Sequence, residues 1–423
     1  MLQVQQIREH KEDFIARLDK RCIDATAMLD EVIAIDDNRK QTQQQLDEVL
    51  AESNGLAKSI GQLFKEGKRD EAEQMKAKTA ELKVKSGELK ETLGHLENDL
   101  TEKLYHIPNV PNPSVPKGKS EEDNEIIRTV GEAVDHSETA KPHWEVAKDF
   151  DLIDFERGVK ITGAGFPVYK GKGAKLQRAL INFFLDQATE AGYDEVIPPL
   201  MINEESGYGT GQLPDKEGQM YHVTEDDLYL IPTAEVPITN LYRGEIIETS
   251  HLPVKNVGYT PCFRREAGSY GKDVRGLNRL HQFDKVEIVQ VVNPEESYKI
   301  LDQMVDHVTG LLEKLELPYR VLRLCGGDLG FTAALTFDME VYSGAQKRWL
   351  EVSSVSNFET YQANRLKLRH RSGKDKPQLA HTLNGSALAL PRIMAALIEN
   401  NQKDGKVIIP KALVPYTRFE TIG

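Results

Sequence analysis

The chain has 423 residues, which is enough for two or three domains and at least one large hydrophobic core. Apolar residues make up 39% of it and charged residues 29%, and no stretch approaches the roughly 20 consecutive apolar residues that span a bilayer, so we expect no membrane-spanning segment. The formal net charge of −13 argues against indiscriminate nucleic-acid binding, which needs many Lys and Arg contacts to phosphates. A local basic surface is still compatible with this charge.

The N-terminus and the cysteines both indicate a cytoplasmic protein. Charged residues occur from the start of the chain, so the apolar segment of a secretory signal is missing. The three cysteines, Cys22, Cys262 and Cys325, are far apart and include no C-x-x-C pair. We therefore expect neither a disulfide framework nor a Cys-based zinc site.

Residues 28–104 predict two long helices that pack against each other. The segment has almost no proline, and its apolar residues follow heptad spacing in two runs that are separated around Gly67. The first run is Met28, Val32, Ile35, Leu46, Val49, Leu56, Ile60 and Leu63, and the second is Met75, Leu82, Leu89, Leu93, Leu96 and Leu100. This pattern is typical of an antiparallel coiled-coil hairpin, here with helices of roughly 50 Å.

The outer part of this hairpin is basic relative to the rest of the chain. Residues 57–90 contain nine Lys and Arg against six Asp and Glu. A solvated helix surface explains such charges in most proteins. A long arm of this kind also suits contact with the phosphates of a nucleic acid, and the sequence alone leaves both interpretations open.

A proline-rich segment separates the hairpin from the rest of the chain. Residues 107–125 carry four prolines followed by a charged run, which is typical of a linker. We predict an N-terminal helical arm domain at 1–112, a linker at 113–125 and a second domain at 126–423. Strand and helix patterns are interleaved in the second domain, which predicts an α+β fold with antiparallel hairpins.

Residues 263–287, FRREAGSYGKDVRGLNRLHQFDKVE, read as a hairpin with a basic, glycine-rich loop. Side chains alternate along a strand, so we expect Arg264 and Glu266 to share one face, with Arg265 on the other. The same rule groups Phe283, Lys285 and Glu287. A guanidinium suits phosphate or carboxylate oxygens and a phenyl ring can stack on a base, so the hairpin predicts a nucleotide site. Lys272, Arg275 and Arg279 add charge in the loop, although a merely solvated surface hairpin is the alternative.

Upstream of this hairpin, residues 176–191 predict an amphipathic helix. A strand follows, with Pro198 and Pro199 beside it. Because proline cannot donate a hydrogen bond to a neighbouring strand, we expect this strand at the edge of a sheet or at an interface. The four glycines of residues 163–173 lack the spacing of a P-loop and favour a tight turn. Thr233 and Glu235 are two residues apart, so an extended backbone would place both on one face, where the carboxylate could hold an ammonium group.

Two further patterns follow the hairpin. Glu351 and Ser354 offer oxygen ligands of the kind that Mg²⁺ prefers, although a strand end with capping serines explains them equally well. Residues 385–390 predict a strand and the following residues a helix, with Pro391 at the first helical position. Arg392 would then lie at a helix N-terminus, which favours anions.

The order of these features resembles the three signature motifs of class II aminoacyl-tRNA synthetases. With the helical hairpin, TGQLP at 210–214, TAE at 233–235 and HTLNGS at 381–386, the whole chain resembles the seryl-tRNA synthetase family of bacterial type. The resemblance implies an antiparallel sheet flanked by helices, in a homodimer whose interface includes the Pro198 segment. It also implies that L-serine and ATP give seryl-adenylate, and that serine is then transferred to tRNA(Ser) and, in the family, to tRNA(Sec).

The resemblance also implies roles for individual residues. Arg264 would bridge the α-phosphate and the serine carboxylate, Glu266 would accept from the adenine amino group, and Phe283 would stack on the base. The implied ATP-binding set is Arg264, Arg265, Glu266, Arg279, Phe283, Glu351, Val352, Ser353, Ser354 and Arg392, with Glu351 and Ser354 as ligands of the Mg²⁺ that accompanies ATP. The implied serine-binding set is Thr233, Ala234, Glu235, Arg264, Glu287 and Ser386. Arg264 and Arg392 would be the catalytic residues.

Some positions depart from the commonest family pattern, among them Val352, Val355 and Pro391. None removes a contacting side chain, and Pro391 affects only the local backbone. The lack of Cys-rich ligands separates the chain from the zinc-dependent archaeal form, so no zinc is expected. Two alternatives are a paralogue that loads a small amino acid onto a carrier protein and a non-catalytic RNA-binding coiled-coil protein. The simultaneous presence of the arm and the site residues argues against both.

Overall fold

The computed structural model describes residues 1–136, 138–215, 217–266 and 275–423. The chain divides into two compact units. The first unit contains residues 2–19 and 23–108, and the second contains residues 20–22 and 109–423 together with Met1. We call the first the arm and the second, which contains the residues to which the resemblance assigns catalysis, the catalytic domain, and we describe each separately.

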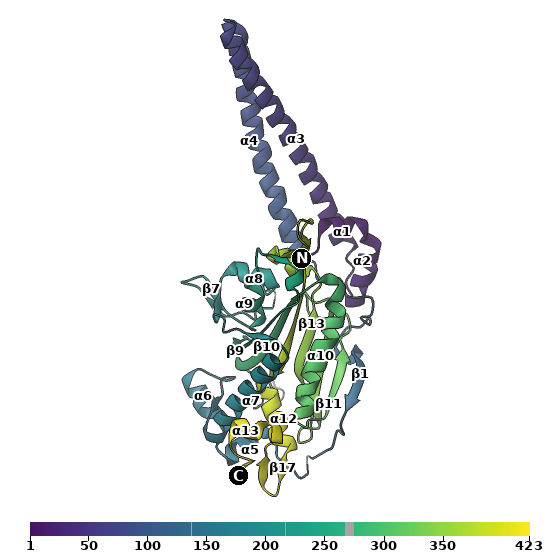
Figure 1. Ribbon diagram of the computed structural model, residues 1–423, viewed down its shortest axis with the longest axis vertical. Helices are drawn as coiled ribbons and strands as arrows, with labels where there is room; N and C mark the ends of the chain where they lie inside the picture. The colour runs from purple at the N-terminus through teal and green to yellow at the C-terminus, as the bar shows by residue number, and fades with distance from the viewer. Residues whose placement is uncertain (137, 216, 267–274) are drawn as a thin grey trace. The chain divides into compact units, whose positions relative to one another are not determined.

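The arm consists of two short and two long helices. The short ones are α1 (Val4–Glu9) and α2 (Lys11–Leu18), and the long ones are α3 (Thr26–Lys65) and α4 (Arg69–Tyr105), which form an antiparallel hairpin (Figure 1). Gly67 adopts φ +78° in the turn, and the amide of Lys68 donates to the carbonyl of Leu63 at 3.0 Å. A glycine in this left-handed conformation is a common way to end a helix. The predicted hairpin and its turn are confirmed.

Polar residues fill the gaps in the heptad pattern. Thr42 and Ser86 are buried between the long helices, in positions where the sequence shows no apolar residue. The apolar heptad residues are buried or half-buried throughout both helices. The two helices therefore pack along one continuous seam, as the spacing predicted.

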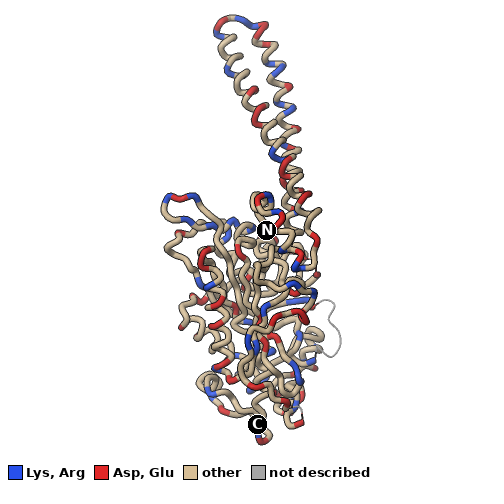
Figure 2. The backbone as a smooth tube through the Cα atoms, turned by 90° about the vertical axis from the view of Figure 1, so that its right-hand side faces the viewer, with Lys and Arg blue, Asp and Glu red and all other residues tan. Residues whose placement is uncertain are grey.

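The outward surface of the arm carries charges of both signs, visible along both long helices in Figure 2. Lys78 pairs with Glu52 at 2.6 Å, and Lys103 pairs with Glu31 at 2.6 Å, each linking α4 to α3. Such exposed pairs contribute little to stability, typically about 0–1 kcal/mol. The apolar seam, rather than the ion pairs, holds the hairpin together.

The catalytic domain is built on a sheet of eight strands in the order β1-β11-β12-β13-β16-β10-β9-β4. Every pair in this sheet is antiparallel except β4 with β9. The strands are β1 (Glu125–Val130), β4 (Asp194–Glu195), β9 (Val254–Phe263), β10 (Gln282–Val292), β11 (Tyr319–Arg323), β12 (Leu335–Ser343), β13 (Arg348–Asn357) and β16 (His381–Ala389). The predicted α+β class is confirmed.

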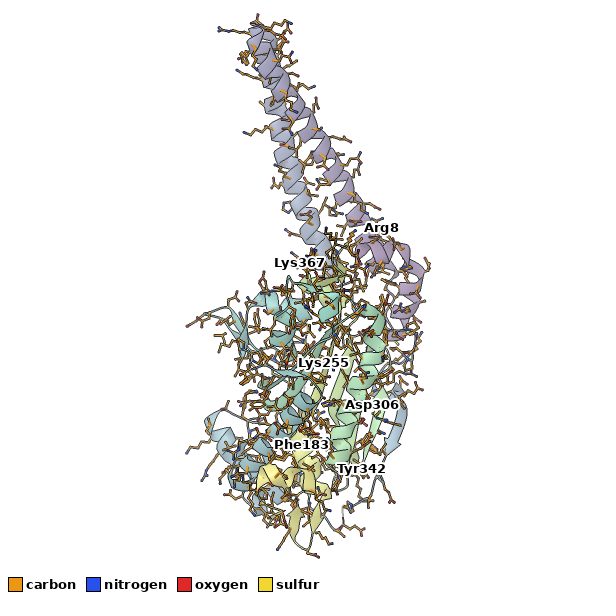
Figure 3. All side chains as sticks on the ribbon, in the orientation of Figure 1. Arg8, Phe183, Lys255, Asp306, Tyr342 and Lys367 are labelled. Carbon is orange, nitrogen blue, oxygen red and sulfur yellow. The ribbon has the colours of Figure 1, made fainter. Side chains whose placement is uncertain are left out.

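Three long helices pack against this sheet: α7 (Gly171–Glu190), α10 (Ser297–Lys314) and α12 (Leu390–Asn400). Their apolar sides form the main hydrophobic core with the inner faces of the strands; Phe183, labelled on α7 in Figure 3, belongs to it. The shorter helices are α5 (His143–Asp149), α6 (Phe155–Ile161), α8 (Glu204–Thr210), α9 (Glu235–Asn240), α11 (Tyr361–Leu366) and α13 (Val414–Thr417). The small-sheet strands are β2 (Ile153–Asp154), β3 (Val168–Tyr169), β5 (Met201–Ile202), β6 (His222–Val223), β7 (Leu228–Leu230), β8 (Ile246–Glu248), β14 (Arg369–Arg371), β15 (Gln378–Leu379), β17 (Gln402–Lys403), β18 (Lys406–Ile408) and β19 (Thr421–Ile422).

The segment with Pro198 and Pro199 differs from the predicted strand. Only β4 and β5 are strands here, and residues 196–200 between them belong to no element. The physical reason is that proline cannot donate a ladder hydrogen bond. The neighbouring helix begins earlier than predicted, at Gly171 rather than Leu176.

The first proline-rich residues after the arm lie against the catalytic domain. Asn109 donates from its amide to the carbonyl of Phe331 at 2.9 Å, and Asn112 donates to Ala334 at 2.7 Å. The side chain of Arg21 donates to the carbonyls of Asn109 and Leu329. Residues 109–112 are thus held by specific hydrogen bonds. No helix among the described residues is long and apolar enough to cross a membrane.

Candidate active site

The hairpin predicted from residues 263–287 is formed by β9 and β10. Phe283 lies opposite Cys262, and Glu287 lies opposite Gly258. The strand alternation places Asp284 toward α7, where it accepts from Gln177 at 2.8 Å, and leaves Phe283, Lys285 and Glu287 on the other face. Lys285 and Glu287 form an ion pair of 2.6 Å although they are only 7% and 2% exposed. The predicted grouping of these three residues is confirmed.

The predicted alternation at Arg264, Arg265 and Glu266 is wrong, because β9 ends at Phe263. Glu266 adopts a left-handed backbone conformation with φ +48°, which interrupts any strand pattern. The Arg264 guanidinium nevertheless lies over the Phe283 ring, 5.2 Å from its centroid, and its Nε donates to the carbonyl of Pro232 at 3.3 Å. The backbone of Arg265 donates to the carbonyl of Gln219.

The loop between the strands is described only in part. Lys272 lies outside the described residues. Arg279, on the returning side, is 3.5 Å from Glu266, measured from its Nε to Oε2 of the carboxylate. Arg275 lies over the ring of Trp144 at 6.0 Å. The described base of the loop thus brings Glu266 and Arg279 together.

Thr233 and Glu235 do approach each other, but not through an extended backbone. Glu235 is the first residue of α9, so the predicted strand-like conformation is wrong. The amide of Glu235 donates to Thr233 Oγ1 at 3.2 Å, and that hydroxyl donates to Glu287 Oε2 at 3.3 Å. Ala234 is buried against Ile238 and lends only its backbone to the site. Two carboxylates and one hydroxyl therefore lie close together in one buried cluster, which we call the acidic pocket.

The Glu235 carboxylate is strongly perturbed by this pocket. Burial raises its pKa to about 7, and the neighbouring charge of Glu287 acts in the same direction. A cation entering the pocket would favour the ionised form of Glu235. The electrostatics of this cluster therefore depend on whether a cation is bound beside it.

Two residues of the pocket were missed by the sequence reasoning. Gln362 on α11 donates from Nε2 to Glu235 Oε1 at 2.7 Å. Asn384 on β16 also hydrogen-bonds to Glu235. Asn384 is two residues from Ser386, which lies opposite Glu287 across β16 and β10, so strand alternation could have identified it. No local signal points to Gln362.

Glu351 and Ser354 share a face of the sheet because β13 contains a bulge. Residues three apart on a regular strand point to opposite faces. Here Glu351 pairs with Glu340 and Ser353 pairs with Met339, which leaves Val352 as an extra residue. Ser354 lies opposite Asp338 on β12, two residues from Glu340, so Glu351 and Ser354 lie on the same face. The alternative of a strand end with capping serines is wrong, because both residues lie inside β13.

Arg392 reaches the same area from the first turn of α12, which begins at Leu390, so Pro391 is the second helical residue rather than the first as predicted. Its Nη1 donates to the carbonyl of Glu351 at 2.7 Å and lies 3.4 Å from the Glu351 carboxylate. Val352 is buried in the hydrophobic core, and the Ser353 hydroxyl donates to the carbonyl of Ser386 at 2.6 Å. The side chains of Val352 and Ser353 are thus engaged within the protein.

Asp338 adds a third oxygen group to the Glu351 and Ser354 pair. It accepts a hydrogen bond from Ser354, and its Oδ1 is buried without a hydrogen-bond partner among the described residues. Burial and the nearby Glu351 charge raise the pKa of Asp338 well above its usual value. An orphaned carboxylate oxygen beside a second carboxylate and a hydroxyl fits the oxygen ligand set of Mg²⁺. No cluster of three His, Cys, Asp or Glu side chains suited to a metal occurs among the described residues.

Two family models match the chain. Residues 1–111 match the seryl-tRNA synthetase N-terminal domain, and residues 220–401 match the tRNA synthetase class II core domain (G, H, P, S and T). The second match contains Thr233, Arg264, Phe283, Glu351 and Arg392. The two matches together include both the arm and the site.

Relatives with known names match over the whole chain. A serine–tRNA ligase of Salinibacter ruber is 51% identical over 100% of this chain and 99% of its own length. The crystal structure of seryl-tRNA synthetase from Pyrococcus horikoshii complexed with ATP has a TM-score of 0.93 at 36% identity, over 100% and 99% of the two chains. A cytoplasmic serine–tRNA ligase of Naegleria fowleri in complex with AMP has a TM-score of 0.87 at 27% identity, over 100% and 98%.

Proposed function

The chain belongs to the seryl-tRNA synthetase family, and from this premise we propose that it activates L-serine with ATP and transfers the seryl group to the 3′-terminal ribose of tRNA(Ser). The observation that carries the proposal is that Glu287, next to the buried Glu235 of α9, lies on the same strand and the same face as Phe283, over which Arg264 lies. An ammonium site and a nucleotide site thereby adjoin each other. The predicted family and ligase class are confirmed by the comparisons.

The acidic pocket supports the serine-binding roles. Glu235 would hold the substrate ammonium group, with Thr233 and the backbone of Ala234 shaping the pocket wall. Glu287 and Ser386, opposite each other on β10 and β16, would receive the substrate hydroxyl. A site built to hydrogen-bond a hydroxyl rejects alanine, because its own buried polar groups would be left unpaired.

The hairpin and α12 support the nucleotide roles. Phe283 would stack on the adenine ring and Glu266 would accept from its amino group, with Arg265 beside them. Arg264 would bind both the α-phosphate and the serine carboxylate, and Arg279 and Arg392 would bind the outer phosphates. Arg392 and Arg279 already pair with carboxylates, which ATP phosphates would replace as partners.

The chemistry needs positioning and charge stabilisation more than acid–base groups. The serine carboxylate attacks the α-phosphorus, forming a new O–P bond while the bond to pyrophosphate breaks. Arg264 aligns the two reactants, and Arg264 and Arg392 stabilise the negative charge that develops on the phosphate oxygens. In the second step the terminal ribose hydroxyl attacks the seryl carbonyl and AMP leaves.

Mg²⁺ bound with ATP would be held by Glu351 and Ser354, and the orphaned Oδ1 of Asp338 supports this fit. Mg²⁺ neutralises phosphate charge and fixes the geometry of the triphosphate when it is bound. The main chain of Val352 and Ser353 would border the nucleotide at this point. No role for zinc is included in the proposal.

The remaining assignments concern partners and domain boundaries. We assign tRNA binding to the arm at 1–112, the linker to 113–125 and aminoacylation to 126–423. A homodimer is supported by the exposed apolar side chains beside Pro198, of which Ile197 is 87% exposed. The three free cysteines and the lack of a membrane-spanning helix among the described residues support a cytoplasmic location. Charging of tRNA(Sec) follows from the family alone.

The test is ATP–pyrophosphate exchange with a panel of amino acids, followed by charging of tRNA. We expect exchange that depends on L-serine and Mg²⁺, and seryl-tRNA formation with tRNA(Ser). Exchange no greater than background with serine, or faster with another amino acid, would overturn the assignment. Serine loading onto a carrier protein instead of tRNA would favour the paralogue alternative.

A further inference from the structure

A buried histidine lies beneath the returning side of the hairpin loop. His143, the first residue of α5, is 0% exposed although more than a hundred residues separate it in sequence from the loop. Its Nε2 accepts a hydrogen bond from the backbone amide of Leu277 at 2.8 Å. Since Nε2 is the acceptor, the ring proton belongs on Nδ1, which lies 2.6 Å from Glu399 Oε1 and donates to it.

Glu399 connects this histidine to the loop by a second route. The Glu399 carboxylate accepts from the Ser343 hydroxyl and from Gln346 Nε2, the latter at 2.9 Å. The side chain of Gln346 in turn accepts from Asn278 Nδ2 at 3.1 Å. Burial alone would raise the pKa of Glu399, but its hydrogen bond from His143 and the other partners lower it overall, so the carboxylate stays an acceptor.

The backbone of the loop is shaped to fit over the histidine. Gly276 has φ +64°, and a Cβ at this position would lie 2.1 Å from His143 Nε2. Only glycine permits both this backbone conformation and this close approach. The Leu277 amide and the Asn278 side chain are therefore held by hydrogen bonds, and Gly276 is held by its close contact with His143.

The fixed segment leads directly to two arginines of the nucleotide site. The carbonyl of Asn278 accepts from Arg392 Nε at 3.2 Å, and Arg279 is the next residue in the chain. Glu399 is on α12, the helix that also carries Arg392. The His143–Glu399 pair thus supports both sides of the region assigned to the outer phosphates.

We propose that His143, held by Glu399, is a positioning residue for ATP: it fixes residues 276–278 and thereby orients Arg279 and Arg392 toward the triphosphate. This inference rests on the function proposed above. A purely structural histidine would contribute to stability without a selective effect on ATP. The two roles therefore differ in kinetics.

The test compares two substitutions by serine-dependent exchange and by calorimetric binding of a non-hydrolysable ATP analogue. His143→Asn keeps a donor near Glu399 but loses the acceptor for Leu277, so we expect KM and Kd for the nucleotide to rise about tenfold, as for one lost buried hydrogen bond. His143→Gln places Oε1 near the position of Nε2 and should recover most of this loss. KM for serine should stay within about twofold in both variants.

The matched control is His307→Asn on α10, a histidine of the same domain that packs against Tyr193. This substitution should leave the KM for ATP unchanged, whether or not it changes Tm. Equal increases in KM for serine and ATP, or a lower Tm with an unchanged KM for ATP, would overturn the proposal. If His143→Asn does not fold, Gln346→Met, which cuts the link between Glu399 and Asn278, decides it by the same criteria. Lack of serine-dependent exchange in the unmodified protein would instead refute the proposed function.

Discussion

Thr233 Oγ1 accepts a hydrogen bond from the Glu235 amide and donates one to the Glu287 carboxylate, which places Glu235 and Glu287 in one buried cluster. Two carboxylates in one buried site compete for ionisation, and burial together with the Glu287 charge raises the pKa of Glu235 to about 7. Lys285 partly offsets this competition by pairing with Glu287. We therefore expect the Glu235 carboxyl to lose its proton when a cation binds beside it.

The first prediction concerns the pH dependence of serine binding. Because the ammonium group of serine requires ionised Glu235, KM for serine should rise about tenfold as the pH falls from about 8 to about 6. Exchange assays at several pH values, with KM for ATP as the internal control, measure this directly. The Glu235→Gln variant should bind serine weakly and lose this pH dependence; a KM for serine that is flat over this range in the unmodified protein would contradict the assignment.

The same carboxylate predicts a pH effect on stability. Its folded-state pKa, about 7, lies above the ordinary value of 4.5, so the folded protein retains a proton that the unfolded chain loses. The contribution of Glu235 to the free energy of unfolding is therefore full below about pH 4.5 and falls as the pH rises toward 7. Urea denaturation of the unmodified protein and of Glu235→Gln should show the variant gaining in relative stability across this window. A difference in stability that does not change with pH would contradict the raised pKa.

A third prediction tests Gln362, which the sequence did not reveal. Gln362→Met removes the donor to Glu235 Oε1 and should raise KM for serine by about 10-fold to 100-fold, the range for a hydrogen bond to a charged group, with KM for ATP little changed. Gln290→Met is a matched control, since Gln290 is also buried but bonds to Tyr193. Similar kinetic effects of the two substitutions would argue against a role in serine binding.

A fourth prediction tests the geometry of Arg264. Lysine keeps the charge but cannot form two parallel hydrogen bonds or lie flat over Phe283, so Arg264→Lys should lower kcat for exchange by about 100-fold or more. Single-turnover kinetics separate this loss from effects on product release. Activity within a few-fold of the unmodified enzyme would mean that charge alone suffices at this position.

A fifth prediction separates the arm from the chemistry. Deletion of residues 51–89 with a short connecting turn removes the outer part of α3 and α4. Serine-dependent exchange should remain nearly intact, whereas charging of tRNA(Ser) should fall severely. Equal losses in both assays would show that the arm is not specifically a tRNA-binding element.

The elements that the sequence predicted well are those with a regular spacing. Heptads located the arm, and the period of two along β10 grouped Phe283, Lys285 and Glu287 correctly. The errors occur where the period changes, as at Glu266 with its positive φ and at Thr233, which precedes a helix. Gln362 and His143 could not be found because their partners are distant in sequence and only the fold brings them together.

The bulge at Val352 decides which serine of β13 shares a face with Glu351. On a regular strand the residue two positions after Glu351 lies on its face, and that residue is Ser353. The extra residue shifts this position to Ser354, which lies opposite Asp338, whereas the Ser353 hydroxyl donates to the carbonyl of Ser386. An alignment of this region that counts β13 as a regular strand would therefore assign the wrong serine to the proposed Mg²⁺ site.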